Sequence, residues 1–251
     1  MNQNVTNISW NAGVVPLARN ETHDKVIAMM QKEPREKVLD MPTGTKILAD
    51  RLKKMGFEVS CCDINPFYFS VSDLPLEIGD LNQSLPYTSK SFNFIICLEG
   101  LEHLENPFNA IREFSRLLKP NGRAFLSLPH YLNIEKRLRF LITGLFSKVP
   151  SPKKLGQDRF ENLWMLHLNA LTYPILKLFM EHCGLKIIHI DKDKEKKRMK
   201  WFLPIVWCIR FYCLFWPQEK KKDYHLEDTL SPRLIMGGNI LIIVGEKGPE
   251  G

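Results

Sequence analysis

Apolar positions change their spacing along the segment from Glu36 to Pro66. A short apolar run ends at Asp40, and after a turn the apolar residues recur at helical spacing from 47 to 55. A second apolar run, Phe57–Cys62, is closed by Asp63. The pattern predicts a strand, a helix and a second strand, which together make a right-handed βαβ unit of a parallel sheet.

Similar patterns continue along the chain and predict an α/β protein. We expect helices from Asn20 or Thr22 to Gln31 and over 109–118, 134–146 and 173–182, and strands over 92–98, 123–128, 185–190 and 238–245. Pro120-Asn121-Gly122 is predicted to be a turn between a helix and a strand.

The turn after the first strand has the chemistry of a nucleoside site. At Gly44 the missing Cβ lets a ligand approach the backbone, and the following helix begins with free N–H groups. Asp63 follows about twenty residues later, where a carboxylate can accept the hydroxyls of a ribose. The sequence lacks the three-glycine fingerprint of a dinucleotide site, so we expect a different nucleoside-type cofactor.

Further motifs follow in a recognisable order. They are Val38-Leu39-Asp40 with Gly44, Asp63, Gly79-Asp80-Leu81, Ser91 to Cys97, Glu102 to Pro107 and Leu117 to Leu128. Their order and spacing resemble the class I S-adenosylmethionine-dependent methyltransferases of types 11 and 23. The resemblance implies a Rossmann-like sheet of seven mostly parallel strands, the last one antiparallel, with helices on both faces.

The same resemblance implies a set of cofactor contacts. Asp40 and Gly44 would flank the methionine moiety, Asp63 the ribose, Asp80 and Leu81 the adenine, and Leu98 and Glu99 the sulfonium. The cofactor-binding residues implied in this way are Asp40, Met41, Pro42, Thr43, Gly44, Asp63, Ile64, Asp80, Leu81, Leu98 and Glu99. Lys46 stands where the family usually has a second glycine, which leaves open a non-catalytic binding module with the same fold.

Three histidines are candidates for the chemistry of methyl transfer. His130 follows a predicted strand, His167 precedes a predicted helix, and His103 lies in the segment after the fourth strand. A hydroxyl acceptor needs a base, and each histidine is a candidate for that role.

Glu99, Glu102 and His103 suggest a second possibility. On a helix beginning near Glu99 these three side chains would share one face, and His130 or His167 would add a further metal ligand. The spacing is similar to that of metal-assisted O-methyltransferases that act on RNA 3′ ends or quinone precursors. Because the same segment is widespread in methyltransferases that use no metal, we expect no metal here and keep a metal-assisted O-methyltransferase as the alternative.

Two stretches, 132–166 and 191–235, are predicted to be insertions in a single domain spanning 1–251. The second contains Trp201–Trp216, an almost wholly apolar run with basic residues on both sides. Sixteen residues are too few for a confident membrane span. The run is interpreted as a lid over the substrate, as an anchor in the membrane interface, or as both.

Charge and cysteine content narrow the possible partners. The net charge is +7, and its lysines and arginines cluster beside apolar stretches, which favours an anionic membrane surface over nucleic acid. Six cysteines occur without a C-x-x-C pair, and the first residues lack an apolar signal core. We therefore expect a cytoplasmic enzyme that methylates a hydroxyl of a small or lipid-linked acceptor, and we keep peripheral contact with the inner face of the membrane as an open alternative.

Overall fold

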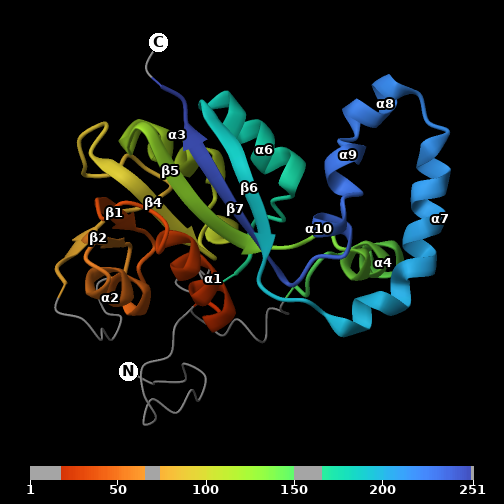
Figure 1. Ribbon diagram of the computed structural model, residues 1–251, viewed down its shortest axis with the longest axis horizontal. Helices are drawn as coiled ribbons and strands as arrows, with labels where there is room; N and C mark the ends of the chain where they lie inside the picture. Colours follow the sequence, from red (N-terminus) through yellow and green to blue (C-terminus); the bar gives the residue numbers. More distant parts are fainter. Residues whose placement is uncertain (1–17, 66–73, 150–165, 250–251) are drawn as a thin grey trace, which may run out of the picture.

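The computed structural model describes residues 18–65, 74–149 and 166–249, and it has a seven-stranded sheet with helices on both faces (Figure 1). The strands are β1 (Lys37–Asp40), β2 (Glu58–Asp63), β3 (Leu76–Ile78), β4 (Phe92–Leu98), β5 (Leu118–Pro129), β6 (Leu185–Lys192) and β7 (Ile240–Lys247). The helices that cover the sheet are α1 (Asn20–Met30), α2 (Ile47–Lys54), α3 (Pro107–Leu117) and α6 (Tyr173–His182).

The strand order is β3-β2-β1-β4-β5-β7-β6. The first five strands pair in parallel, whereas β7 lies antiparallel to both β5 and β6. The predicted fold class is therefore confirmed, including the antiparallel last strand. The chain runs outward from β1 to β3 and then returns to place β4 on the other side of β1, which makes a topological switch point between β1 and β4.

Alternate residues of the central strands face two separate cores. Leu39 and Ile95 pack on one side of the sheet with α3 and α6, whereas Val38 and Ile96 pack on the other side with α1 and α2. A strand buried on both faces needs apolar residues at successive positions, which explains the continuous apolar runs of the sequence.

The expected turn at residues 120–122 is wrong in one respect, because β5 already begins at Leu118. Leu118 pairs with Phe92 and Arg123 with Phe94, so extra residues of β5 bulge out between these two pairs. Asn121 has a φ of 61° in this bulge, a conformation that asparagine tolerates.

The remaining helices form a separate group beside the sheet (Figure 1). They are α4 (Ile134–Thr143), α7 (Leu203–Leu214), α8 (Gln218–Asp223), α9 (Leu226–Thr229), α10 (Pro232–Ile235) and the 3-10 helix η3 (Lys197–Phe202). Ile134, Met199, Val206 and Ile235 form the small core of this helical insert. Residues 150–165 of the first predicted insertion lie outside the described residues.

Candidate active site

Three acidic residues lie at the carboxyl ends of adjacent parallel strands. Asp40 ends β1, Asp63 ends β2, and Asp80 follows β3. Ligands of open α/β sheets bind at this edge, beside the switch point. The structure thus places the predicted methionine, ribose and adenine residues in the order that one extended nucleoside ligand would need.

The Asp63 carboxylate is held in place by backbone donors. Its Oδ2 accepts the Gly44 N–H at 2.8 Å, and its Oδ1 accepts the Asn65 N–H at 3.0 Å. Gly44 has a φ of 51°, which its missing side chain permits. Burial raises the pKa of Asp63, while these N–H groups act in the opposite direction. An ionised carboxylate accepts more than two hydrogen bonds, so Asp63 retains capacity for ribose hydroxyls.

Asp40 is almost completely buried beneath the turn that follows β1. Its Oδ2 accepts the Thr43 hydroxyl at 2.9 Å. Burial raises the pKa of Asp40 to about 7, and the nearby Asp63 charge acts in the same direction. Met41 and Pro42 continue the turn, and a Cβ on Gly100 would lie 2.6 Å from the Pro42 ring. The loops after β1 and β4 therefore meet directly at the switch point.

Lys46 has a φ of 60°, in the left-handed region that favours glycine. Its Nζ donates to the Leu74 carbonyl at 2.5 Å. In the pairing of β3 with β2, Ile78 lies beside Asp63 and Leu76 lies beside Cys61. Leu74 precedes Leu76, so its carbonyl lies nearer the amino ends of these strands than Asp63 does. The lysine therefore takes the glycine conformation, and its ammonium group is directed away from the edge where the acids lie.

The predicted adenine residues lie at the outer part of the same edge. Asp80 accepts hydrogen bonds from the backbone and side-chain amides of Asn82, at 2.8 and 3.1 Å. Leu81 is buried, and its carbonyl accepts Asn109 Nδ2 at 3.2 Å. Ile64, just after β2, is 53 % exposed and so presents an apolar surface beside Asp63. Apolar contact beside hydrogen-bonding groups suits a purine.

The helix expected to begin near Glu99 is not formed. Glu99 has a φ of 50°, and only a short 3-10 helix, η1 (Leu101–His103), follows. The Glu99 Oε1 accepts a hydrogen bond from the backbone N–H of Arg19 at 3.0 Å, and this bond fixes the start of α1 against the end of β4. Burial raises the pKa of Glu99. Leu98, the last residue of β4, is buried beside it. Because the backbone turns here, Glu99 does not share a face with Glu102 and His103.

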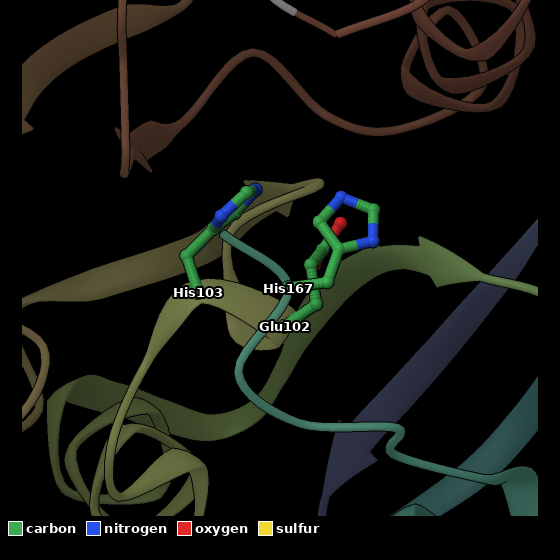
Figure 2. A group of neighbouring side chains, drawn as sticks. All are labelled: Glu102, His103 and His167. Carbon is green, nitrogen blue, oxygen red and sulfur yellow. The ribbon is translucent and has the colours of Figure 1, made fainter. Parts of the chain in front are cut away.

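A different trio comes together instead: Glu102, His103 and His167 (Figure 2). One potential ligand atom from each residue lies within 4.8 Å of the other two. The two imidazole rings are 5.0 Å apart between centroids, at an interplanar angle of 82°. Glu102 and His103 come from η1, and His167 comes from the segment before α6 (Figure 2).

The Glu102 carboxylate is buried and unsatisfied. Both of its oxygens are inaccessible to solvent, and neither has a hydrogen-bond partner among the residues that the structure describes. Burial raises the pKa of Glu102 to about 8. An unsatisfied buried carboxylate is costly, so a native one calls for an explanation such as an ion.

The two histidines are oriented by neighbouring groups. His103 Nδ1 lies 3.0 Å from the Leu166 carbonyl, and since a carbonyl only accepts, Nδ1 carries the proton and Nε2 keeps its lone pair. His167 Nδ1 lies 3.5 Å from the Tyr131 hydroxyl. Metal-binding histidines usually donate through one ring nitrogen to a neighbouring acceptor, which fixes the orientation of the ring.

Asn169 holds the His167 segment against η1, a role that the sequence gives no signal for. Its backbone N–H donates to the Glu102 carbonyl at 3.1 Å, and its side-chain amide donates to the Leu104 carbonyl. The contact joins residues that lie more than sixty positions apart, so no local pattern could predict it. It explains how His167 reaches the other two members of the trio.

His130 is separated from this group. It is 1 % exposed, and its Nε2 lies 2.7 Å from the Leu234 carbonyl, to which it must donate. Burial lowers the pKa of His130 to about 4. A Cβ on Gly237 would overlap the imidazole ring, which shows how tightly α10 covers it. This geometry fits a structural residue that fastens the helical insert to β5.

The residues present fit S-adenosylmethionine, because a row of carboxylates with remaining acceptor capacity follows the β3-β2-β1 edge. They also fit a divalent cation, because the described part of the chain offers the Glu102 carboxylate no hydrogen bond and two imidazoles lie beside it. Fold and site together define the class of nucleoside-binding transferases built on this seven-stranded sheet.

Comparisons with known proteins agree with this class. Residues 18–190 match the family model described as a methyltransferase domain. The ubiquinone biosynthesis O-methyltransferase of Pseudomonas aeruginosa is 31 % identical over 164 residues, which cover 57 % of this chain and 71 % of that protein. The family match spans more than half of the chain, so the chain belongs to this methyltransferase family and is an S-adenosylmethionine-dependent methyltransferase.

Solved structures show the same fold at lower sequence identity. An S-adenosylmethionine-dependent methyltransferase from Archaeoglobus fulgidus has a TM-score of 0.54 at 16 % identity, covering 90 % of this chain and 94 % of its own. The YcgJ protein of Bacillus subtilis has a TM-score of 0.57 at 17 % identity, covering 93 % and 100 %. At these identities the likeness supports the fold alone.

Proposed function

We propose that this chain is an O-methyltransferase that acts on a hydroxyl of a small, lipid-linked acceptor, with a divalent cation held by Glu102, His103 and His167. The observation that carries the proposal is the buried Glu102 carboxylate, which lies beside two imidazoles and has no hydrogen-bond partner in the described ranges 18–65, 74–149 and 166–249. The O-methyltransferase name of the Pseudomonas aeruginosa relative supports the hydroxyl as acceptor, and its quinone pathway supports a lipid-linked substrate.

The cofactor-binding part of the proposal assigns a role to each acid. S-adenosylmethionine supplies an electrophilic methyl group on a positively charged sulfur. Asp63 would hold the ribose hydroxyls, Asp80 and Leu81 the adenine, and Asp40 with the 41–44 turn the methionine end. Leu98 and Glu99 would place the methyl group at the mouth of the switch point, because they follow β4 directly. Correct alignment supplies much of the catalysis in such a transfer.

Glu102, His103 and His167 would prepare the acceptor. A bound divalent cation favours the ionised form of a hydroxyl. Two imidazoles and one carboxylate suit manganese, iron or zinc ions better than magnesium. His167 is exposed while Glu102 is buried, so the open side of the trio faces the direction from which an acceptor would arrive.

A base without a metal is the second candidate. His103 and His167 were both predicted as bases, and burial with the neighbouring His103 lowers the pKa of His167, which keeps its imidazole neutral and able to accept a proton. His130 does not enter this proposal, because its Nε2 donates to Leu234 inside the core.

Metal binding by the full chain separates the two candidates without an assay of activity. We expect the purified, metal-free protein to bind about one Mn²⁺ per chain in calorimetry and electron paramagnetic resonance. His167→Ala and Glu102→Gln should each weaken binding at least about tenfold. His189→Ala, at an exposed histidine of β6, is the matched control and should bind as the native chain does.

Absence of binding for Mn²⁺, Fe²⁺ and Zn²⁺ alike, or binding that His167→Ala leaves unchanged, would refute the metal site. Methyl transfer that persists in excess chelator would then favour the histidine base.

The place of reaction follows from the acceptor class. We propose that the enzyme meets its acceptor at an anionic membrane surface on the cytoplasmic side. Among the described residues, no helix is long and apolar enough to cross a bilayer.

A further inference from the structure

The helix α7 is apolar around its whole circumference, yet it buries only a narrow stripe. Val206 and Cys213 are the buried residues of this helix. Trp207, Phe211 and Phe215 are 71 %, 63 % and 74 % exposed. A helix that is apolar on all sides is normally covered on all sides, by protein or by lipid. The outward surface of α7 therefore lacks a partner among the described residues.

The position of α7 leaves this surface open. In Figure 1 the helix forms the side of the helical insert that is farthest from the sheet. Its buried stripe packs on the small core of the insert, around Met199 and Val206. The outward face, defined here by Trp207, Phe211, Leu214 and Phe215, points away from that core.

Basic residues outnumber acidic ones at both ends of this face, where Arg198 pairs with Glu135 and the acids Glu219 and Asp223 flank the lysines of α8. Lys197, Arg198 and Lys200 are exposed before its first turn, and Lys220 and Lys222 are exposed after its last turn. No aspartate or glutamate occurs between Glu195 and Glu219. Basic residues at both ends of an apolar helix complement the phosphate groups of an anionic bilayer.

The single charge inside α7 is turned away from the outward face. The Arg210 guanidinium donates from Nη2 at 2.6 Å and from Nε at 3.2 Å to the Leu230 carbonyl. This contact fastens α7 to the chain between α9 and α10. It also leaves the outward face free of charge along its length.

Amphipathic aromatic residues mark both ends of the helix. Trp201 is 85 % exposed in η3. At the other end the Trp216 ring contacts Tyr212 and Tyr224, and Lys220 Nζ lies 4.2 Å from the centre of that ring. Tryptophan and tyrosine prefer the level of lipid headgroups, where one part of the ring is apolar and the other is wet.

We propose that the outward face of α7 is a membrane-contacting surface that lies flat in the headgroup region of an anionic bilayer. The twelve residues of α7 are too few to span a bilayer but enough to lie in its interface. The purpose of the contact, delivery of a lipid-linked acceptor, rests on the proposed function. The contact itself does not, because it needs neither cofactor nor acceptor.

The insert connects this face to the active site through short steps. Leu230, which binds Arg210, lies four residues before Leu234, whose carbonyl binds His130. Tyr131, the residue after His130, places its hydroxyl 3.5 Å from the Nδ1 atom of His167. These contacts link the helical insert that carries α7 to the elements that hold Glu102, His103 and His167.

Sedimentation of the full chain with lipid vesicles tests the proposal. We expect the protein to pellet with vesicles of phosphatidylcholine and phosphatidylglycerol, and to stay in solution with phosphatidylcholine alone. The variant Trp207→Ser/Phe211→Ser/Phe215→Ser should reduce binding at least about tenfold. Lys220→Gln/Lys222→Gln should reduce binding to the anionic vesicles about tenfold.

Matched controls come from surfaces elsewhere on the chain. Ile175→Ser/Leu178→Ser removes two exposed apolar side chains of α6, and Lys53→Gln/Lys54→Gln removes two charges of α2. Both should bind vesicles as the native chain does. Because the changed residues are exposed, we expect all four variants to keep the native circular dichroism spectrum.

Two results would overturn the proposal. The first is a lack of pelleting with the anionic vesicles, or pelleting that the α7 variant leaves unchanged. The second is a stable dimer in light scattering that the α7 variant dissociates, since a second copy of the chain would then be the occupant of this face. Binding of S-adenosylhomocysteine measured on the same samples reports the proposed function separately.

Discussion

At the scale of single residues, the candidate site contains buried carboxyl groups whose surroundings disfavour the ionised form. Asp40 is 2 % exposed and has a single side-chain donor in contact, the Thr43 hydroxyl. Its pKa of about 7 lies above the usual 3.8, so the folded state binds this proton more tightly than the unfolded state does. The contribution of Asp40 to stability therefore falls as the pH rises from 4 to 7.

Replacement of the Asp40 carboxyl should reveal how its protonation changes the stability of the fold with pH. We expect the free energy of unfolding of Asp40→Asn, measured relative to that of the native chain, to be higher at pH 8 than at pH 4.5. The increase should be on the order of 2–4 kcal/mol. Urea unfolding at the two pH values, without cofactor, measures the difference. Asp191→Asn is the control: the ion pair with Lys25 lowers the pKa of Asp191, so this carboxyl stays ionised across the range and its difference in free energy of unfolding should hardly change between the two pH values. A pH-independent difference for Asp40→Asn would contradict the assignment.

Lys46 provides a second test at this scale. Since its ammonium group binds the Leu74 carbonyl, Lys46→Gly should change the Kd for S-adenosylhomocysteine by less than about threefold. The left-handed φ suits glycine, so folding should be retained. Calorimetric titration of both proteins gives the comparison. A gain of affinity above about tenfold would mean that the lysine side chain obstructs the site instead.

At the scale of elements, the helical insert is fastened to the sheet by a few buried polar contacts. Asn133 is fully buried and caps α4, with its Oδ1 accepting the Lys136 N–H at 2.9 Å. Its Nδ2 donates to the Gly238 carbonyl at 2.7 Å, just before β7. One side chain thus joins the start of the insert to its end.

Removal of this side chain should cost more than the loss of a helix cap alone. We expect Asn133→Ala to lower the free energy of unfolding by about 2–4 kcal/mol, because buried polar groups lose their partners. Asn106→Ala removes the exposed cap of α3, whose Oδ1 accepts the Asn109 N–H at 3.2 Å, and should cost about 1 kcal/mol. Equal losses in thermal or urea unfolding would show that Asn133 acts only as a cap.

At the scale of the whole molecule, the parts that the sequence predicted are those with local patterns. The βαβ unit, the acids at the strand ends and the antiparallel last strand follow from apolar runs, from turns and from the family resemblance. Asp40 ends β1 just before the Gly44 turn, and Asp63 follows Gly44 by 19 residues, a spacing that one crossover helix between two parallel strands imposes.

The rest depends on long-range contacts or on backbone details that periodicity does not contain. The positive φ of Glu99 ends the expected helix, and the Asn169 contacts bring His167 to Glu102 instead. His130 was predicted at a strand end, which is true, but its burial beneath α10 depends on residues more than a hundred positions away. The apolar run at 201–216 is interpreted as a lid, an anchor or both, and its sequence does not contain the exposure on which the proposed membrane contact rests.

The central claim is that S-adenosylmethionine binds along the carboxyl edge of β3, β2 and β1, and calorimetric titration of the full chain with S-adenosylhomocysteine tests it most directly. The account predicts saturable binding with a micromolar Kd. Asp63→Ala should weaken it at least about tenfold, because a hydrogen bond to a charged group is lost. Asp24→Ala, at an exposed acid of α1, should leave the Kd unchanged. No binding at millimolar ligand, or equal affinity of Asp63→Ala and the native chain, would contradict the account.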